Sequence, residues 1–447
     1  MEKVDLVTPV EKAAKLLSRL SLDFFDVYAA HSRSLNIEIL GKGIKESMSR
    51  TDLGLGVRAY KNKGLGVAFS QSLKAEDIET TVRRAANFAS IAQPDPYFKG
   101  MLGPSKAAEV LGLCDSEIVA LTLGEAGLLA KRMIEAVENV CQGAMYSGGL
   151  GAGHSKGYLM TSTGVSVEVE KTSISASVAP TYRKGDDVGS SYEYDYAISL
   201  AEMDFEKIGK QAAEKAVAQF GSKRVESGNL PIILTPESTS SLVFGLLGAI
   251  SGESAAKGRT FASGCLGKQV APSNFEVVDD GTISGAIASG TFDGEGVPRK
   301  RVEVVSKGIV KTFLHNYYSA GIMGTETTGH AVRGGYGGYV GAGPTNVQVK
   351  PGDSTMDEMV AETKRGILAT NAGIMPNFVS GEFSSTIDEG FLVENGEKKH
   401  PVKNLMAGGH VLELFRDIEL ISKEGRTVGK GFFFPYVKIK EVKFAGK

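Results

Sequence analysis

The stretch SRTDLGLGVRAYKNKGLGVAFS, residues 49–70, sets the pattern of the first half of the chain. Alternating side chains on both sides of the charged turn Lys61-Asn62-Lys63 are typical of two paired strands. A segment from Lys74 to about Ala92 follows with helical spacing, acidic residues early and basic residues late, as the helix dipole prefers. Strand, charged turn, strand and helix therefore form the unit to seek elsewhere.

The same order recurs in residues 170–218, where Arg183-Lys184-Gly185 is the charged turn and an acidic-headed helix runs from Ala201 to Phe220. In each copy, a helix and two shorter extended stretches are predicted to precede this unit. The first copy has its helix at 8–20 and its stretches at 24–30 and 34–40. The second has its helix at 116–140 and its stretches at 143–147 and 157–162. We therefore expect an α+β domain over residues 1–225, built by duplication from about 1–95 and 115–220.

Glycine distinguishes the second half: 56 of the 447 residues are Gly, 21 in residues 1–220 and 35 in residues 221–447. Its extended stretches, turns and helices are predicted as follows: a strand at 230–234, a helix at 238–251 that is apolar on every side and therefore buried, hairpins within 275–315, a helix at about 355–368, a hairpin at Asn395-Gly396 and a last strand at 432–439. Residues 226–447 should form a Gly-rich, mainly antiparallel β domain with a few packed helices.

Composition excludes several classes of protein. The net charge is −2, which lacks the basic excess of most nucleic-acid binders. The chain begins without an apolar signal core, and its uncharged run at 238–252 is shorter than the roughly 18 residues of a membrane span. Three widely spaced cysteines permit no disulfide framework or Cys-x-x-Cys zinc site. We expect a cytoplasmic protein without nucleic-acid or membrane partners.

Residues Gly153-His154-Ser155-Lys156-Gly157 match the Gly-x-Ser-x-Gly pattern of a nucleophile elbow. An elbow requires a helix after the serine, whereas the residues that follow are strand-like. We therefore expect a flexible glycine loop here. No phosphate-binding glycine motif occurs elsewhere in the sequence.

The run from Thr327 to Arg333, together with Leu314-His315-Asn316-Tyr317-Tyr318, places polar and aromatic side chains among glycines. Such a run suits either a cleft that binds polypeptide or a tightly turned loop. The candidate peptide-cleft residues are His315, Asn316, Thr328, His330, Arg333 and Asn346.

Several segments in order resemble one family: 191–194 through 208–209, Thr327 to Arg333, Gly343-Pro344-Thr345-Asn346, Ser380 to Ser384, Glu394 to Glu397 and Pro401-Val402-Lys403. They are similar to the TldD/TldE (PmbA) family, formerly called modulators of DNA gyrase and regarded as metalloprotease-related peptide maturation proteins. The resemblance covers nearly the whole chain and implies hydrolase chemistry on peptides.

The resemblance also implies where a metal would lie. TldD-like members carry a His-Glu-x-x-x-His helix and a cysteine in a Cys-Gly-Lys context. The corresponding helix here is Leu242 to Ile250, without His or Glu, and the C-terminal position reads Val428-Gly429-Lys430. Apolar side chains offer no donor to Zn²⁺. We therefore expect no metal and no cofactor in this chain, as in the TldE/PmbA branch.

The function implied is that of a non-catalytic or regulatory subunit, inactive alone, which pairs with a zinc-carrying TldD-like subunit and admits extended or unfolded peptides. A homodimer or heterodimer is expected. One alternative is a self-sufficient peptidase that uses His315 and His330 with Glu326 or Asp388. Another is a gyrase- or DNA-associated binding protein, which near-neutral charge disfavours.

Overall fold

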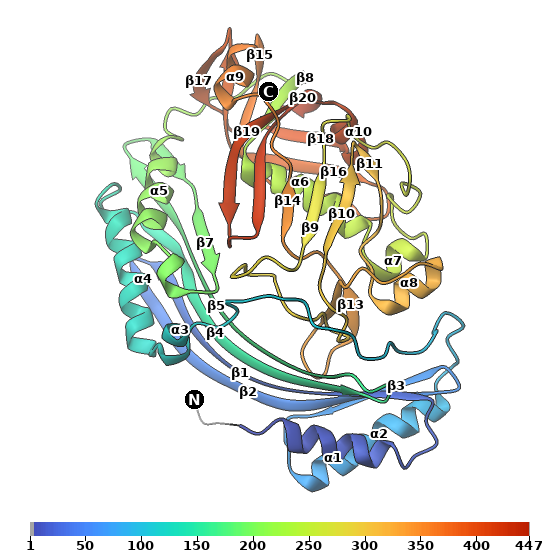
Figure 1. Ribbon diagram of the computed structural model, residues 1–447. Helices are drawn as coiled ribbons and strands as arrows, with labels where there is room; N and C mark the ends of the chain where they lie inside the picture. The colour runs from blue at the N-terminus through green and yellow to red at the C-terminus, as the bar shows by residue number, and fades with distance from the viewer. Residues whose placement is uncertain (1–3, 447) are drawn as a thin grey trace.

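The computed structural model describes residues 4–446 as a mixed α/β chain with two large sheets (Figure 1). The first sheet has seven strands in the order β3-β2-β1-β4-β5-β6, with β7 also paired to β5. Its strands are β1 Phe24–Gly41, β2 Gly43–Lys61, β3 Gly64–Ser70, β4 Met145–Thr161, β5 Ser166–Lys184, β6 Asp187–Ser190 and β7 Glu193–Ala197. The long strands β1, β2, β4 and β5 curve beneath the rest of the molecule.

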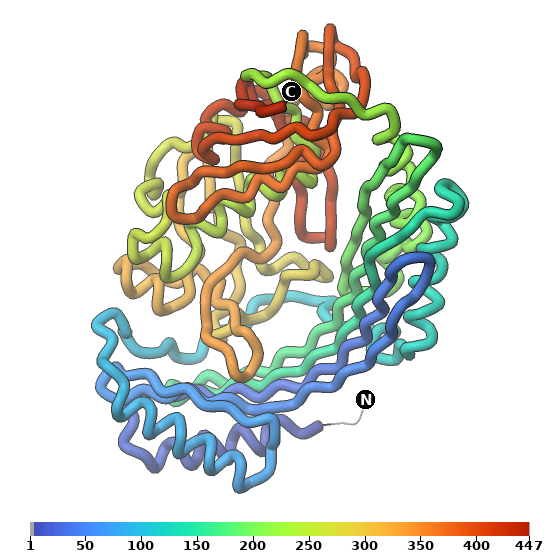
Figure 2. Tube along the Cα trace, turned by 180° about the vertical axis from the view of Figure 1, so that it is seen from behind, coloured from blue at the N-terminus to red at the C-terminus, as the bar shows by residue number. Residues whose placement is uncertain are grey.

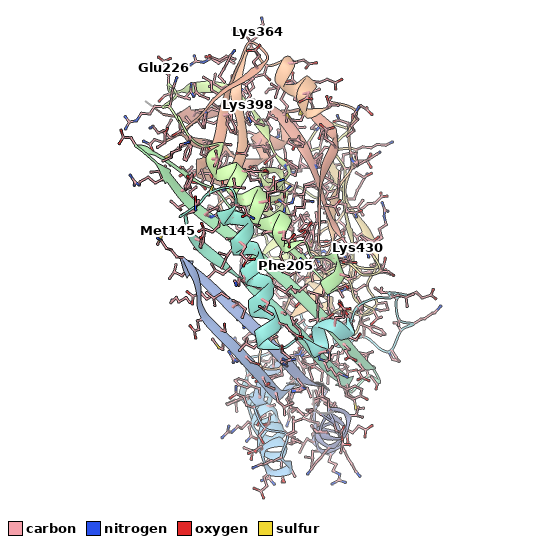
Figure 3. All side chains as sticks on the ribbon, turned by 90° about the vertical axis from the view of Figure 1, so that its left-hand side faces the viewer. Met145, Phe205, Glu226, Lys364, Lys398 and Lys430 are labelled. Carbon is pink, nitrogen blue, oxygen red and sulfur yellow. The ribbon has the colours of Figure 1, made fainter. Side chains whose placement is uncertain are left out.

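Helices cover the outer face of this sheet in two groups. Helices α1 (Val7–Leu17) and α2 (Ala75–Ile91) cover one end, and α3 (Ser116–Ala120), α4 (Leu123–Glu138) and α5 (Phe205–Val217) cover the other. Figure 3 shows α4 and α5 over the sheet, with Phe205 at the start of α5. The two groups follow the repeated order of elements that the sequence predicts, while the duplication itself stays a prediction.

The second sheet has eleven strands, formed by residues 228–445. Most pairs are antiparallel, but β15 pairs with β8 and β14 pairs with β20 in parallel. Its strands are β8 Gly228–Leu234, β9 Val277–Asp280, β10 Arg301–Ser306, β11 Ile309–Val310, β14 Val347–Val349, β15 Arg365–Ala372, β16 Glu382–Glu394, β17 Glu397–Pro401, β18 Met406–His410, β19 Ile418–Val428 and β20 Phe432–Ala445.

Five helices and a small hairpin accompany the second sheet. They are α6 Pro236–Ala249, α7 Gly252–Ala256, α8 Tyr317–Met323, α9 Met356–Ala361 and α10 Val411–Arg416, with the hairpin β12 (Ala331–Arg333) and β13 (Val340–Ala342). The apolar α6 is buried in the largest hydrophobic core, as its sequence predicts. No helix within residues 4–446 is long and apolar enough to span a membrane.

Several predicted elements prove to be parts of longer ones. The stretches at 24–30 and 34–40 are one strand, β1, and those at 143–147 and 157–162 are one strand, β4. The Gly153–Gly157 motif lies inside β4, so the expected flexible loop is wrong. Because β4 is paired on both sides, its glycines are held by neighbouring strands and allow close approach. A Cβ at Gly149 would lie 2.4 Å from the Ile37 carbonyl oxygen.

Several predicted helices are shorter than expected, and the one predicted from Ala201 to Phe220 is α5, Phe205–Val217. The helix at 116–140 divides because Thr122 starts α4 with a capping box, in which its side chain and that of Glu125 bond each other's backbone amides. The helix at 355–368 ends at Ala361, because Arg365–Ala372 supplies the strand β15 between β8 and β16. A local capping box thus divides the helix predicted at 116–140, whereas strand pairing overrides helical spacing in the one predicted at 355–368.

Alternate residues of the stretch 49–70 face opposite sides of the first sheet. Leu55, Val57 and Ala59 point into the core beneath α1 and α2. Gly54 and Gly56 lie on the opposite, inner face, where the β12–β13 hairpin reaches down to the sheet (Figure 2). The hairpin residue Tyr336 lies so close that a Cβ at Gly56 would come within 1.6 Å of its carbonyl oxygen. Glycine is required here for close approach between the two halves.

Substituting Gly56 by alanine should therefore loosen this hairpin. We expect Gly56→Ala to lower the free energy of unfolding by about 1–3 kcal/mol, because the backbone contact leaves no room for the methyl group. Urea unfolding, together with limited proteolysis around residues 334–338, measures both effects. Gly43→Ala is the matched control, since nothing lies within 4 Å of its Cβ position on the same strand. Equal stability of the two variants would contradict the docking role.

Candidate functional site

A buried carboxylate joins the two halves of the molecule. Asp26 on β1 is fully buried and accepts hydrogen bonds from Arg58 on β2, the Nε bond being 2.7 Å. Arg333 on β12 reaches the same carboxylate at 3.2 Å through Nη2 and stacks its guanidinium over the Tyr28 ring at 5.1 Å. One carboxylate therefore holds two cations from different halves of the chain.

The charge state of Asp26 follows from these partners. Burial by itself raises the pKa of this carboxyl, but Arg333 and Arg58 outweigh it and lower the net pKa. Asp26 is therefore ionised at neutral pH, and the pair of guanidinium groups is left with only one excess positive charge.

Arg58 also lines a cavity of about 390 Å³ between the two halves, here called the interdomain cavity. Its walls come from β2, the linker at 95–102, α7, the start of α8 and β13. Aromatic and charged side chains share the lining: Tyr60, Phe98, Tyr317, Tyr318, Tyr339, Lys63, Lys99, Lys257, Asp95, Glu253 and Glu295. A concave cavity of this size, in which aromatic side chains and converging polar groups meet, is typical of a ligand site.

Polar contacts hold the wall of the interdomain cavity in place. The Tyr318 hydroxyl donates to Asp95 at 2.5 Å, and Lys257 donates to the same hydroxyl at 3.1 Å. The Lys257 ammonium also lies 5.3 Å from the centres of the Tyr97 and Tyr318 rings. These contacts connect the linker with α7 and α8.

Glu295 is the cavity's most perturbed acid. Burial raises its pKa to about 7, and its Oε2 accepts the Tyr317 backbone N–H at 2.8 Å. The carboxyl can therefore donate or accept a proton near neutral pH. Sequence reasoning missed Glu295, Arg58 and Asp26, since a lone charged residue in a strand or turn reads as a solvated face.

Four of the predicted cleft residues form one buried cluster. The Thr328 hydroxyl accepts the His315 backbone N–H at 2.6 Å and lies 3.0 Å from His330 Nδ1. His315 Nδ1 lies 3.0 Å from Ser319 Oγ, and the Asn316 side chain caps α8. His315, Asn316, Thr328 and His330 are all at most 6% exposed. Of these four, Asn316 lines the interdomain cavity.

The other two predicted residues lie apart from this cluster. Arg333 binds Asp26 and lines a second cavity of about 540 Å³. Asn346 is fully buried and donates to the Ser289 hydroxyl at 2.7 Å. A Cβ at Gly431, in the turn after β19, would lie 2.2 Å from the Asn346 side-chain oxygen. The contribution of these residues to peptide binding stays a prediction.

The alternative His315–His330 site does not assemble with its expected acids. Burial, followed by the nearby His330, lowers the pKa of His315 to about 4, so this imidazole stays neutral. The carboxylate near His330 is Asp279, 3.3 Å from Nε2. Glu326 and Asp388 are both exposed and make no contact with either imidazole within residues 4–446.

The resemblance implies that α6 takes the place of the metal-binding helix of TldD-like members. Its outer face meets Val428 and two strand aromatics, with the Phe244 ring 5.9 Å from that of Phe432 and 5.7 Å from that of Phe434. These side chains leave a cavity of only about 30 Å³, little more than the volume of one or two waters.

The one carboxylate on this face is already engaged. Arg426 donates to Glu237 at 2.6 Å and to Glu193 at 2.5 Å. Burial raises the pKa of Glu237, but Lys215 and Arg426 reverse the shift and keep the carboxylate ionised. Phenyl and isopropyl groups cannot ligate Zn²⁺, and this carboxylate is neutralised by arginine. The side chains present around α6 therefore do not fit a zinc site.

Comparison with known proteins agrees with this architecture along the chain. Residues 25–89 match PmbA/TldA metallopeptidase domain 1, residues 116–220 match the central domain, and residues 227–446 match the C-terminal domain. The chain belongs to the PmbA/TldD family. Among the family's members, the metalloprotease PmbA of Escherichia coli O157:H7 is 24% identical over 98% of this chain and 95% of its own length.

Two further similar proteins also match over more than nine-tenths of the chain. An uncharacterised Methanocaldococcus jannaschii protein is 26% identical over 92% of this chain and 94% of its own. The crystal structure of TldE from Thermococcus kodakarensis superposes with a TM-score of 0.86 at 24% identity, over 98% of this chain and 99% of that chain. At this identity the superposition establishes the PmbA/TldD fold alone.

Titration of Glu295 should make the stability of this family member depend on pH. The folded carboxyl keeps its proton up to about pH 7, whereas the unfolded one loses it near its ordinary pKa of 4.5. Stability from this group is therefore present below pH 4.5 and is lost as pH rises through 7. We expect Glu295→Gln to be about 1–3 kcal/mol more stable than the wild type at pH 8 and nearly equal to it at pH 4.

Chemical denaturation at pH 4, 6 and 8 measures this difference. Glu326→Gln, an exposed carboxyl outside the interdomain cavity, is the control and should follow the wild type. Burial also raises the pKa of Glu389 to about 7. Glu389 therefore contributes the same pH dependence of the free energy of unfolding to the wild type and to both variants. Parallel pH profiles for wild type and Glu295→Gln would refute the assignment.

Proposed function

We propose that this chain is the non-catalytic partner subunit of a cytoplasmic TldD-type metalloprotease that cleaves extended or unfolded peptides. The zinc and the peptidase chemistry would belong to a TldD-like subunit, and the pair would form a heterodimer. The relatives named metalloprotease support the peptidase class.

One observation carries the non-catalytic role. The α6 face and Val428, which correspond to the ligand positions of TldD-like members, are filled by Phe244, Phe432 and the Glu237–Arg426 ion pair. Restoring a metal there would require replacing packed aromatic rings and releasing a paired carboxylate. The fold is therefore kept while the donors are absent, which is the pattern expected of a partner subunit.

The interdomain cavity is the proposed place for peptide contact. Of the six predicted cleft residues, Asn316 lines this cavity and Arg333 lines the second cavity. These two are therefore the residues proposed to contact the peptide. Tyr339, 78% exposed, stands at the cavity wall beside the β13 backbone. Aromatic side chains and strand edges suit an extended peptide, which pairs through its own backbone.

Subunit pairing can be tested with purified proteins. We expect the chain alone to leave an unstructured peptide such as denatured casein intact, and co-expression with a TldD-like chain to yield a complex that cleaves it. Cleavage should stop on chelation and return with Zn²⁺, because the metal resides in the partner. Size-exclusion chromatography and peptide mass spectrometry measure assembly and cleavage.

Two outcomes would contradict the proposal. Cleavage by the chain alone, lost in His330→Ala, would support a self-sufficient peptidase. Failure of the two chains to co-purify, with a salt-dependent shift of duplex DNA by this chain, would support a DNA-associated role, consistent with the name modulator of a DNA gyrase given to a Thermotoga maritima protein of the same fold.

Peptide contact at the interdomain cavity has its own test. We expect Tyr339→Ala to weaken binding of an unstructured fluorescent peptide to the complex roughly tenfold, as loss of an exposed aromatic anchor does. Fluorescence anisotropy measures the dissociation constant. Tyr192→Ala, a partly exposed tyrosine outside the cavity, is the matched control and should bind as the wild type. Equal effects of both variants would place the peptide elsewhere.

A further inference from the structure

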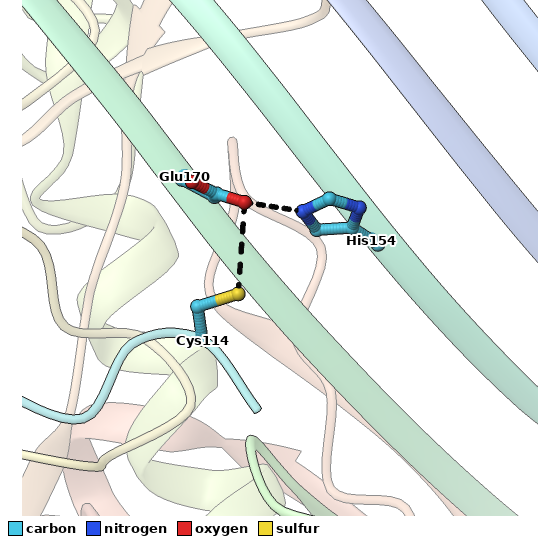
Figure 4. Close-up of side chains that lie close together, drawn as sticks. All are labelled: Cys114, His154 and Glu170. Carbon is cyan, nitrogen blue, oxygen red and sulfur yellow. Dashed lines mark hydrogen bonds and ion pairs between the residues drawn. The ribbon is translucent and has the colours of Figure 1, made fainter. Parts of the chain in front are cut away.

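Three side chains with metal-ligating atoms meet on the outer side of the first sheet, far from α6 in the sequence. They are Cys114, His154 and Glu170, and Figure 4 shows them facing one another. His154 Nε2 lies 2.7 Å from Glu170 Oε1, and Cys114 Sγ lies 3.8 Å from the same oxygen. Their ligand atoms all lie within 4.8 Å of one another, and no other such group of three occurs in residues 4–446.

The backbone holds these three residues firmly. His154 is in the middle of β4 and Glu170 on the adjacent β5. Cys114 belongs to the linker before α3, which is fastened to β5 on either side of the cysteine. The Thr172 N–H donates to the Leu113 carbonyl at 3.0 Å, and the Asp115 N–H donates to the Thr172 hydroxyl at 2.9 Å. The cluster is therefore preorganised by a sheet and a strapped linker.

Burial differs across the cluster in a way that suits a ligand. His154 is 5% exposed, and its Nε2 is the ring nitrogen that faces Glu170. Cys114 is exposed and Glu170 is partly exposed, so the cluster opens toward solvent on one side.

The arrangement does not suit a catalytic thiol. A catalytic cysteine contacts an imidazole that accepts its proton, whereas Cys114 Sγ lies 3.8 Å from a carboxylate oxygen of Glu170. Glu170 Oε1 is in turn contacted by His154 Nε2 at 2.7 Å and by the Lys156 ammonium at 3.1 Å. The cluster therefore offers a carboxylate, an imidazole and a thiol, but it lacks the thiol–imidazole contact of a catalytic cysteine.

We infer that Cys114, His154 and Glu170 form a binding site for a divalent cation of the zinc class. Sγ, Nε2 and Oε1 would be three ligands, and a water on the open side would complete a tetrahedron. This mixture of sulfur, nitrogen and oxygen donors favours Zn²⁺ over Mg²⁺ or Ca²⁺. Binding releases the thiol proton to solvent, so the cation replaces one proton and the sulfur becomes a thiolate.

One competing charge must move aside. The Lys156 ammonium lies 3.1 Å from Glu170 Oε1, where a cation would bind. The Lys156 side chain is 33% exposed and can turn into solvent when the metal takes its place. The site is distinct from α6 and needs no TldD-like partner, so it stands apart from the proposed function.

Cobalt provides a direct test on the purified full-length chain without its partner. We expect Co²⁺ to give a thiolate-to-cobalt charge-transfer band and Zn²⁺ to abolish it by competition. Cys114→Ala should remove the band, and Glu170→Gln should weaken Zn²⁺ binding by roughly tenfold or more in isothermal titration calorimetry. Cys265→Ala, a buried cysteine remote from this cluster, is the matched control and should keep the band.

The cobalt experiment distinguishes metal binding at this cluster from metal binding elsewhere on the chain. A band lost in Cys114→Ala and kept in Cys265→Ala supports the inference. Absence of any thiolate band, or Zn²⁺ binding unchanged in Cys114→Ala, overturns it. Circular dichroism of each variant confirms that it is folded, and Lys156→Gln provides a second check because removing the competing ammonium should tighten Zn²⁺ binding by at least a few fold.

Discussion

Asp26 is the contact on which the arrangement of the two halves depends. It is fully buried, and two guanidinium groups, Arg58 from its own sheet and Arg333 from the β12–β13 hairpin, converge on it. Removing one partner of such a buried group leaves an uncompensated charge, which is far more costly than losing a surface ion pair. These contacts hold the hairpin where Arg333 reaches Asp26 and Tyr336 lies over Gly54 and Gly56.

That docking also creates the interdomain cavity. Arg58 contributes to both the ion pair and the cavity wall, and the β13 strand that ends the hairpin supplies the opposite wall. The raised pKa of Glu295 is a consequence, because the halves enclose this carboxyl beside the start of α8. A change that separates the halves would thus alter the cavity and the protonation of Glu295 together.

The family's scaffold is kept here by different chemistry around α6. An aromatic cluster of Phe244, Phe432 and Phe434 fills the helix face, and the Arg426 guanidinium bridges Glu237 and Glu193 from separate elements. Arg426 also stacks on Tyr194, with 4.9 Å between the guanidinium carbon and the ring centre. Aromatic packing and paired charges thus stabilise this helix–strand junction.

Local pattern and residue chemistry already specify the strand alternation, the turns at Lys61-Asn62-Lys63 and Asn395-Gly396, the buried helix α6 and the apolar side chain at Val428. Tertiary structure instead sets the lengths of β1 and β4, since glycines that break an isolated strand are held by partners on both sides. It also decided that His315, Thr328 and His330 are buried, since polar residues among glycines suit a cleft or a closed turn equally. Cys114, His154 and Glu170 could not be linked from sequence, because strand pairing and a strapped linker bring together residues without motif spacing.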